Sequence, residues 1–421
     1  MFVESKWALA RVVLFSLGYV LLFQSDSSVA GSKEAFAAIS VVFAVIGAFR
    51  LRKLEDQRIP RGIFLAVGIM LVLLLAWVAR IAGGGVGLDD WIRDSLNYIL
   101  FPVAMLIGAD AGTSVSRAIL GRLVVVIGVF GAITFMSTWL ARRSGALFGA
   151  EQVGLASSFV PLTSIALCLA IFFAGDRWRG GALIIGLGQM VLLAVSGGRS
   201  VWIYCLAALI AAFLSAGVPL GARIGRATVA LAAAGFGAAL VFSLSTAIGG
   251  GIAVTRFTRF RSLAEGGLDS IFSDASAIER IRAYEWTTLI WHNNVLFGRG
   301  LGFTFPSVTT GNVNAGIYTL DTPVIALAKF GIIGTLMILA ALVILWWTLW
   351  SASRGDRVAR CVLVTLTGAV IVLLPNGFPI ENRGFDLLVC LAVAYVIAAG
   401  AAVARKSSAS VAEQERKEPV G

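Results

Sequence analysis

Long apolar runs recur along the whole chain and constrain its fold more than any other feature. Of its 421 residues, 58% are hydrophobic and only 14% are charged, whereas soluble domains have about 45–50% apolar and about 25% charged residues. Many of the runs reach the roughly 17 residues that a transmembrane helix needs. A chain this apolar cannot cover its surface in water, so we expect an all-α, polytopic integral membrane protein.

The apolar runs predict about twelve transmembrane helices and one long extracytoplasmic loop. The tenth helix is long enough to be tilted or to begin outside the bilayer. The first run could instead be a signal peptide, since Ser28–Ala30 resembles a cleavage site, but an uncleaved helix keeps the topology consistent. The expected helices span residues 7–23, 35–49, 62–82, 95–109, 123–140, 154–174, 182–195, 201–217, 228–248, 322–350, 361–376 and 384–404. We expect four regions: nine helices in 1–248, the loop with an amphipathic helix in 249–321, three helices in 322–404 and a disordered cytoplasmic tail in 405–421.

The distribution of Lys and Arg predicts the orientation of these helices. With the N-terminus inside, cytoplasmic segments hold nineteen Lys and Arg, whereas the short outer loops hold six. Cytoplasmic loops of membrane proteins carry this excess of positive charge. Both termini are therefore expected in the cytoplasm. The net charge of +11 does not indicate nucleic-acid binding, because the basic residues lie in short clusters between apolar runs.

Arginines on the predicted outer side are candidate ligand-binding residues, because the positive-inside rule works against them. Arg199 lies in "SGGRS", between two apolar helices. It could be an interfacial arginine that reaches lipid phosphates, or it could bind an anionic ligand bidentately. Arg280 and Arg282 lie on the predicted outer helix, two positions apart and so on different sides. Arg282 can pair with Glu279, which makes Arg280 the better candidate.

Three other outer residues have both a structural and a catalytic interpretation. His292, the single histidine, could end the outer helix or serve as a general base. Asp321 could cap helix ten, since Thr-Pro follows it, or it could be a base where the chain re-enters the membrane. Glu381 could form a structural pair with Arg383. The sequence "FGRGLG" predicts a sharp turn, because no strand precedes it as a nucleotide loop would require.

Metal and disulfide chemistry are not expected from this sequence. The four cysteines lie inside apolar runs without metal-ligand spacing and are interpreted as small apolar fillers. The acidic residues are scattered rather than clustered, unlike the carboxylates of a metal site. We therefore expect no metal and no cofactor.

From about residue 140 onward, the chain resembles the O-antigen ligase and polysaccharide polymerase superfamily of bacterial inner membranes. "RRSGALFG", which holds Arg142 and Arg143, is similar to an arginine-glycine outer loop of that family, and "SGGRS" to its serine-arginine turn. "ERIRAYEWTTLIWHNNVLFGRGLGF" is similar to its arginine helix and glycine turn, with Arg280 at the family arginine and Tyr284 at its usual tryptophan. "LDTPVIALAKFGIIG" is similar to the segment that leads into the next helix. Family ligases carry a histidine where this chain has Leu320–Asp321, and an aspartate here is more similar to the polymerase branch.

The resemblance implies a glycosyltransferase that polymerises undecaprenyl-diphosphate-linked oligosaccharide units at the extracytoplasmic face. Arg199 and Arg280 would then stabilise the charge that grows on the lipid diphosphate leaving group, with help from Arg142 or Arg143. Asp321 would be the base for the acceptor hydroxyl, with Glu381 behind it. Tyr284 and Glu381 would help to bind the glycan.

Two other functions remain open on the sequence alone. A ligase would transfer a finished glycan to a lipid or protein acceptor. A flippase or other transporter would carry internal repeats and charges at the membrane midplane, but intramembrane charge is sparse, with Arg11, Arg80 and Lys329 all near predicted helix ends. The expected partners are a lipid-linked glycan donor and acceptor, membrane lipid, and potentially a chain-length regulator and export machinery, but no nucleic acid.

Overall fold

The computed structural model describes residues 2–24, 31–54, 58–78, 86–144, 159–175, 179–195, 199–247, 275–306, 316–317, 322–374, 377–381 and 384–417. Its described part holds thirteen α-helices, one short 3-10 helix and a pair of two-residue strands. The α-helices are α1 (Phe2–Gln24), α2 (Ser32–Arg52), α3 (Arg58–Val78), α5 (Leu88–Ser114), α6 (Arg117–Ser144), α7 (Phe159–Ala174), α8 (Arg179–Val195), α9 (Arg199–Ser215), α10 (Leu220–Ala247), α13 (Ala275–His292), α14 (Ile325–Ser353), α15 (Arg357–Leu373) and α16 (Phe385–Lys417). The 3-10 helix is η3 (Pro379–Glu381), and strands β1 (Phe305–Pro306) and β2 (Gly316–Ile317) pair antiparallel.

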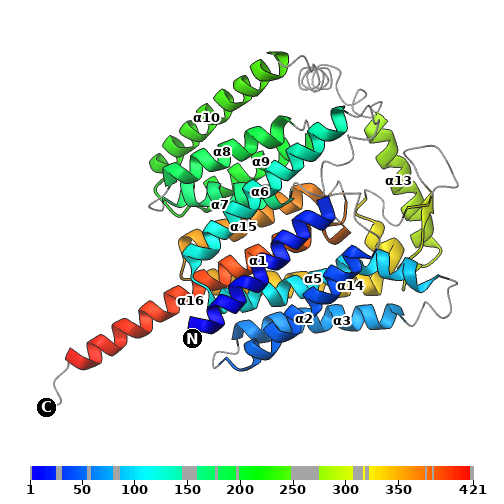
Figure 1. Cartoon of the computed structure of the whole chain (residues 1–421), viewed down its shortest axis with the longest axis horizontal. Helices are drawn as coiled ribbons and strands as arrows, with labels where there is room; N and C mark the ends of the chain where they lie inside the picture. The colour runs from blue at the N-terminus through cyan, green and yellow to red at the C-terminus, as the bar shows by residue number, and fades with distance from the viewer. Residues whose placement is uncertain are drawn as a thin grey trace.

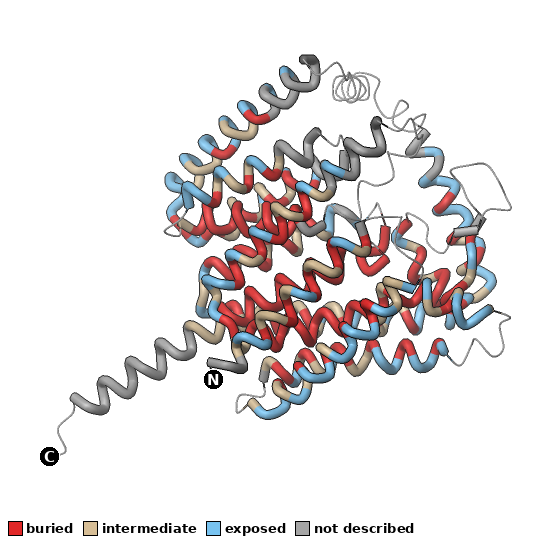
Figure 2. The backbone as a smooth tube through the Cα atoms, in the orientation of Figure 1, coloured by how far each residue is buried: buried red, intermediate tan, exposed pale blue. Residues whose placement is uncertain are grey.

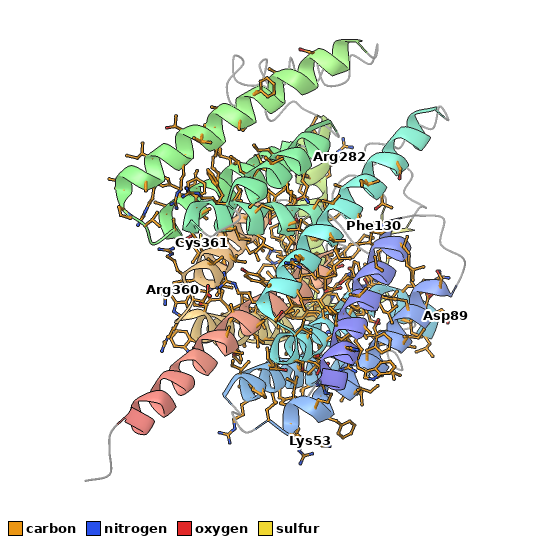
Figure 3. All side chains as sticks on the ribbon, turned by 60° about the vertical axis from the view of Figure 1, so that its left-hand side comes forward. Lys53, Asp89, Phe130, Arg282, Arg360 and Cys361 are labelled. Atoms are coloured by element: carbon orange, nitrogen blue, oxygen red, sulfur yellow. The ribbon has the colours of Figure 1, made fainter. Side chains whose placement is uncertain are left out.

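The helices form an up-and-down bundle whose two ends differ. Both chain termini lie at one end, which we call the terminal end, and α13 crosses the opposite end, which we call the α13 end (Figure 1). Most other helices run from one end to the other, whereas α13 lies across the direction of these helices (Figure 1). Lys53, just after α2, and Arg360, in the first turn of α15, lie toward the terminal end, and Asp89 at the start of α5 lies on the other side (Figure 3).

Helices α5 and α16 form the buried centre of the bundle (Figure 2). Two glycines spaced four apart allow this pair to approach closely. A Cβ on Gly108 would lie 2.5 Å from the carbonyl oxygen of Cys390, and one on Gly112 would lie 2.8 Å from that of Ala394. Small residues at this spacing are typical of tightly packed membrane helices, because they let the two backbones come together.

Large apolar side chains point outward from the peripheral helices. Leu75 of α3 is 70% exposed and Phe49 of α2 is 64% exposed. Such a surface is unfavourable in water and suits a hydrocarbon environment. Seven of the described helices are long and apolar enough to cross a membrane: α1, α2, α3, α5, α6, α14 and α16, each over most or all of its length. Their length and composition indicate a membrane location.

The predicted helix positions agree with the structure, although several ends differ. Each of the twelve predicted helices overlaps one described α-helix, while their number as membrane spans stays a prediction. The fourth helix was expected at 95–109, but α5 extends from Leu88 to Ser114. The prediction missed both ends of α5 because charged residues there suggested loops, and their partners come from distant segments.

The prediction of a disordered tail at 405–421 is wrong for its first part. Helix α16 continues to Lys417 through "RKSSASVAEQERK". This stretch lacks apolar periodicity, but it is rich in Ala, Glu, Gln, Lys and Arg, which favour helix. Extending an existing helix also costs far less than nucleating a new one.

All four cysteines are buried and free, as expected for small apolar fillers. They are Cys168, Cys205, Cys361 and Cys390.

Candidate functional site

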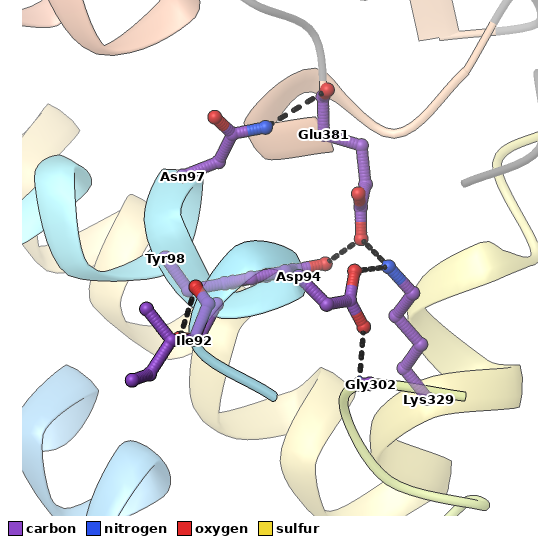
Figure 4. Close-up of polar contacts among 8 residues, drawn as sticks. Ile92, Asp94, Asn97, Tyr98, Gly302, Lys329 and Glu381 are labelled. Atoms are coloured by element: carbon purple, nitrogen blue, oxygen red, sulfur yellow. Dashed lines mark hydrogen bonds and ion pairs between the residues drawn. The ribbon is translucent and has the colours of Figure 1, made fainter. Parts of the chain in front are cut away.

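A buried charge cluster joins three helical segments near the α13 end of the bundle. Lys329 of α14 places its Nζ 2.5 Å from Oδ1 of Asp94 on α5 and 2.9 Å from Oε1 of Glu381 on η3 (Figure 4). Lys329 is 1% exposed, Asp94 5% and Glu381 9%. We call these three residues the Lys329 cluster.

Neighbouring polar groups complete the Lys329 cluster (Figure 4). Tyr98, one turn after Asp94 on α5, donates its hydroxyl to Oε1 of Glu381. Asn97 donates its side-chain amide to the Glu381 carbonyl at 3.1 Å. The backbone N–H of Gly302 donates to Oδ2 of Asp94 at 2.8 Å. The cluster therefore binds the loop after α13 to the bundle as well as joining α5, α14 and η3.

The charge balance of the Lys329 cluster explains why its members are interdependent. One ammonium faces two carboxylates, so loss of Lys329 would leave two buried negative charges facing each other. Breaking a buried pair by removing one partner is strongly destabilising, because the remaining charge has lost its solvation and its counter-charge. Among the described residues, the Oε2 of Glu381 is buried without a hydrogen-bond partner, so this carboxylate is only partly satisfied.

Helix α14 is broken two residues after Lys329. Gly331 has φ 64° and ψ −168°, which are not helical angles. A break frees backbone groups that must find other partners in an apolar environment. The loop after α13 provides them: Arg299 and Gly300 donate their N–H groups to the carbonyls of Ala328 and Lys329, at 2.8 and 2.9 Å.

The remaining bonds run in the opposite direction, from α14 to the loop. Ile332 and Ile333 donate their N–H groups to the carbonyls of Val295 and Leu296, at 2.9 and 3.1 Å. Trp77 of α3 also donates its indole N–H to the Lys329 carbonyl at 3.2 Å. We call this set of backbone bonds between residues 295–300 and 328–333 the α14 junction.

Glycines make the α14 junction possible. Gly298, Gly300 and Gly302 have φ of 64°, 108° and 79°, a region that glycine populates readily and other residues avoid. A Cβ on Gly298 would lie 2.4 Å from the Lys329 carbonyl group, and one on Gly331 would lie 2.4 Å from that of Leu296. The predicted turn in "FGRGLG" is thus observed, and its glycines allow the loop to lie directly on α14.

Arg299 lies within this glycine-rich loop and is exposed. Its guanidinium carbon lies 3.5 Å from the centre of the Phe303 ring, which is close stacking. No acidic side chain within the described part of the chain forms an ion pair with it.

Buried charges also occur toward the terminal end of the bundle. Arg11 of α1 and Arg50 of α2 both bond Asp110 of α5, with Arg50 Nη1 at 2.9 Å from Oδ1. Arg11 lies well inside α1 and is 8% exposed. Intramembrane charge is therefore less sparse than the sequence suggested, because Asp94 and Asp110 were placed outside the fourth helix and their basic partners are far away in sequence.

The predicted site residues on α13 are exposed. Arg280 and Tyr284 lie one helical turn apart, with Tyr284 51% exposed, and Arg282 is exposed as well. Ala283, Thr287 and Ile290 form the buried face of α13, which packs on α14. His292 is the last residue of α13 and is exposed, as expected for a residue at a helix end.

The other predicted site residues are described in part or not at all. Helix α9 begins at Arg199, and Arg142 and Arg143 lie in the last turn of α6, but their side chains lie outside the described residues. Asp321 and Arg383 also lie outside them. Helix α14 begins at Ile325 with Val324 as its N-cap, and the capping role considered for Asp321 stays a prediction.

Glu381 is the one predicted site residue in the Lys329 cluster. Its carboxylate bonds Lys329 and Tyr98, so it has partners other than the Arg383 that its sequence suggested. Asp94 and Tyr98 were not predicted from the sequence to belong to this site. The signal that could have found them is an ionisable residue within an apolar helix, which generally marks a functional or strongly paired position.

The described residues do not form a metal site made of His, Cys, Asp or Glu side chains. No three His, Cys, Asp or Glu side chains gather within the described ranges. Asp94 and Glu381 do share a cation, but that cation is the ammonium of Lys329.

The long apolar helices and the buried ion pairs between them define a helical protein of the membrane class. No protein-family model and no curated protein sequence matches the chain.

Proposed function

We propose that the protein is a membrane glycosyltransferase that joins undecaprenyl-diphosphate-linked oligosaccharide units at the α13 end of the bundle. The observation that carries the proposal is that α13 crosses the end where α9 begins (Figure 1), with Arg280 and Tyr284 exposed on α13 and Arg199 as the first residue of α9. These are the residues that the resemblance to the polymerase superfamily identifies as binding residues.

The start of α9 is well suited to an anionic ligand. The first turn of a helix has backbone N–H groups without intrahelical partners, and the helix dipole is positive there. An arginine at this position is unfavourable for the helix alone, because both charges are positive. An anion that binds the N–H groups and the guanidinium together would remove this conflict.

The proposed reaction has a simple balance of bonds. The acceptor hydroxyl loses its proton to Asp321 and forms a bond to the anomeric carbon of the donor sugar. The bond between that carbon and the diphosphate oxygen breaks, and its electron pair stays on the lipid diphosphate. Arg199 and Arg280, with Arg142 or Arg143, stabilise the growing negative charge electrostatically.

The orientation belongs to the same proposal. Segments predicted to be cytoplasmic lie at the terminal end, and they hold most of the Lys and Arg of the short loops. By the positive-inside rule, the terminal end would lie in the cytoplasm and the α13 end outside a bacterial inner membrane.

Two rival functions remain, and one of them gains from the structure. Buried ionisable residues between membrane helices are typical of transport pathways, so the Lys329 cluster and the Arg11–Asp110–Arg50 set favour a flippase as the second candidate. The charges of the Lys329 cluster pair with one another, however, and the cluster lies at the start of α14 rather than midway along it. A ligase, the nearer rival, would use the same outer site with another acceptor.

The glycan profile of a bacterial strain lacking this chain tests the proposal. Loss of polymer with single repeat units retained is the expected result. Free lipid-linked polymer would instead indicate a ligase. Lipid-linked units that accumulate on the cytoplasmic side would indicate a flippase.

A further inference from the structure

We propose that Arg299 is an additional binding residue for the phosphate groups of the lipid carrier, a role that rests on the proposed function. Neither the outer arginines of the sequence analysis nor the Lys329 cluster includes it. It lies at the α13 end of the bundle, in the loop that directly follows α13.

Hydrogen bonds hold the backbone of Arg299 and its neighbours in place. Its own N–H donates to the Ala328 carbonyl at 2.8 Å, and that of Gly300 donates to the Lys329 carbonyl at 2.9 Å. The N–H of Gly302 bonds the buried carboxylate of Asp94. The loop is thus fixed to α14 and α5 before any ligand binds, which removes an ordering cost that a flexible loop would incur.

The same bonds exclude a different kind of anion site. The N–H groups of Gly298, Arg299, Gly300 and Gly302 all donate to protein oxygens. The glycine-rich loop therefore cannot bind phosphate through these backbone groups, as a nucleotide-binding loop does. Any anion at this loop must bind the side chain of Arg299.

The guanidinium of Arg299 is oriented by the ring of Phe303. Its central carbon lies 3.5 Å from the centre of the Phe303 ring, so the flat face of the guanidinium contacts the ring. The N–H donors lie on its edge, and edge donors are those that bind phosphate oxygens bidentately. No acidic side chain among the described residues pairs with these donors.

Exposed apolar side chains lie next to Arg299 in the sequence. Leu296 is 57% exposed and Phe297 is 51% exposed. Leu296 bonds the backbone of Ile333, and Ile333 and Leu336 continue the exposed apolar surface along α14. A cation beside such a surface matches a ligand with a phosphate head and a hydrocarbon tail, and a polyprenyl diphosphate has this form.

Binding of undecaprenyl diphosphate to the full chain in lipid nanodiscs tests the inference. The variant Arg299→Gln should lower the affinity about tenfold or more, since it removes a charge-assisted bidentate contact. Arg299→Lys should fall in between, because an ammonium keeps the charge but not the planar fork. Arg282→Gln is the matched control, an exposed arginine on α13, and should stay within about twofold of wild type.

Phosphatidylglycerol and inorganic pyrophosphate serve as competing probes in the same assay. Phosphatidylglycerol should show no comparable loss in Arg299→Gln, whereas pyrophosphate should lose affinity together with undecaprenyl diphosphate, because it carries the same diphosphate group. Equal losses for undecaprenyl diphosphate and phosphatidylglycerol would mean a general anionic-lipid site and would overturn the carrier assignment. A loss confined to pyrophosphate would overturn it as well.

The test separates this inference from the proposed function. If wild type and Arg299→Gln bind undecaprenyl diphosphate equally, Arg299 has no such role, although the protein can still be the transferase. If wild type binds no undecaprenyl diphosphate, both proposals fail. The thermal unfolding midpoint of each variant, and the intermediate result expected for Arg299→Lys, distinguish lost contact from lost fold.

Discussion

The ammonium of Lys329 lies 2.9 Å from Oε1 of Glu381, although 52 positions separate the two residues in the chain. Between them lie the remainder of α14 and all of α15, so this contact exists only in the folded bundle. Asp94 approaches the same ammonium from α5, still further away in sequence.

Replacing Lys329 by methionine should destabilise the fold by about 3–5 kcal/mol, because Asp94 and Glu381 would be left buried without their counter-charge. Unfolding of the purified chain in detergent, followed by loss of helical signal, measures this. Lys53→Met is the matched control, since Lys53 is exposed at the end of α2.

A companion variant separates charge from packing at the Lys329 cluster. Adding Asp94→Asn and Glu381→Gln to Lys329→Met should restore part of the lost stability, because no unpaired charge then remains buried. If Lys329→Met unfolds no earlier than Lys53→Met, the cluster does not stabilise the bundle.

The substitution Gly331→Ala should destabilise the fold by about 2 kcal/mol or more. The alanine Cβ would lie 2.4 Å from the Leu296 carbonyl, at a φ of 64° that side chains rarely adopt. Gly68→Ala in α3 is the control: a Cβ there contacts nothing within 4 Å, so alanine should stabilise by up to about 1 kcal/mol. Equal unfolding midpoints for the two variants would contradict the α14 junction.

Reporter fusions test the orientation of the bundle. A reporter that is active only outside the cytoplasm should be inactive when fused at residue 55 and active when fused at residue 270. The motive is the excess of Lys and Arg in the segments assigned to the cytoplasm. The reverse pattern would place Arg199 and Arg280 on the wrong side of the membrane for the proposed reaction.

The substitutions Arg199→Ala and Arg280→Ala should each abolish polymer in cells while the protein stays in the membrane at normal levels. Each removes a guanidinium proposed to stabilise the leaving diphosphate. Lysine at either position should not restore full activity, because it cannot donate bidentately. Arg282→Ala should have a milder effect, since its expected pair with Glu279 contributes only a few tenths of a kcal/mol. Normal polymer from either of the first two variants would remove that residue from the site.

The substitution Asp321→Asn should abolish transfer at normal protein level, whereas His292→Gln should keep most of it. Asparagine retains the size and hydrogen bonding of aspartate but cannot accept the acceptor's proton as a base. His292 ends α13 and is exposed. An active Asp321→Asn together with an inactive His292→Gln would favour a histidine-dependent mechanism of the ligase type.

The sequence by itself determined the helical architecture. Apolar runs located twelve of the thirteen described α-helices, and an outer helix was expected in 249–321, where α13 lies. These features depend on local composition and periodicity, because each apolar segment must satisfy its own backbone hydrogen bonds by forming a helix. The ends of α5 and α16 were misjudged where charged residues continued a helix.

Only the tertiary structure decided which charges meet. Asp94, Lys329 and Glu381 each look like a boundary residue in sequence, and Glu381 seemed closest to Arg383. The fold brings them together because helix packing places the starts of α5 and α14 beside η3, and burial then requires each charge to have a partner. The α14 junction is also decided at this level, since the break at Gly331 is stable only because residues 295–300 satisfy the backbone groups that it exposes.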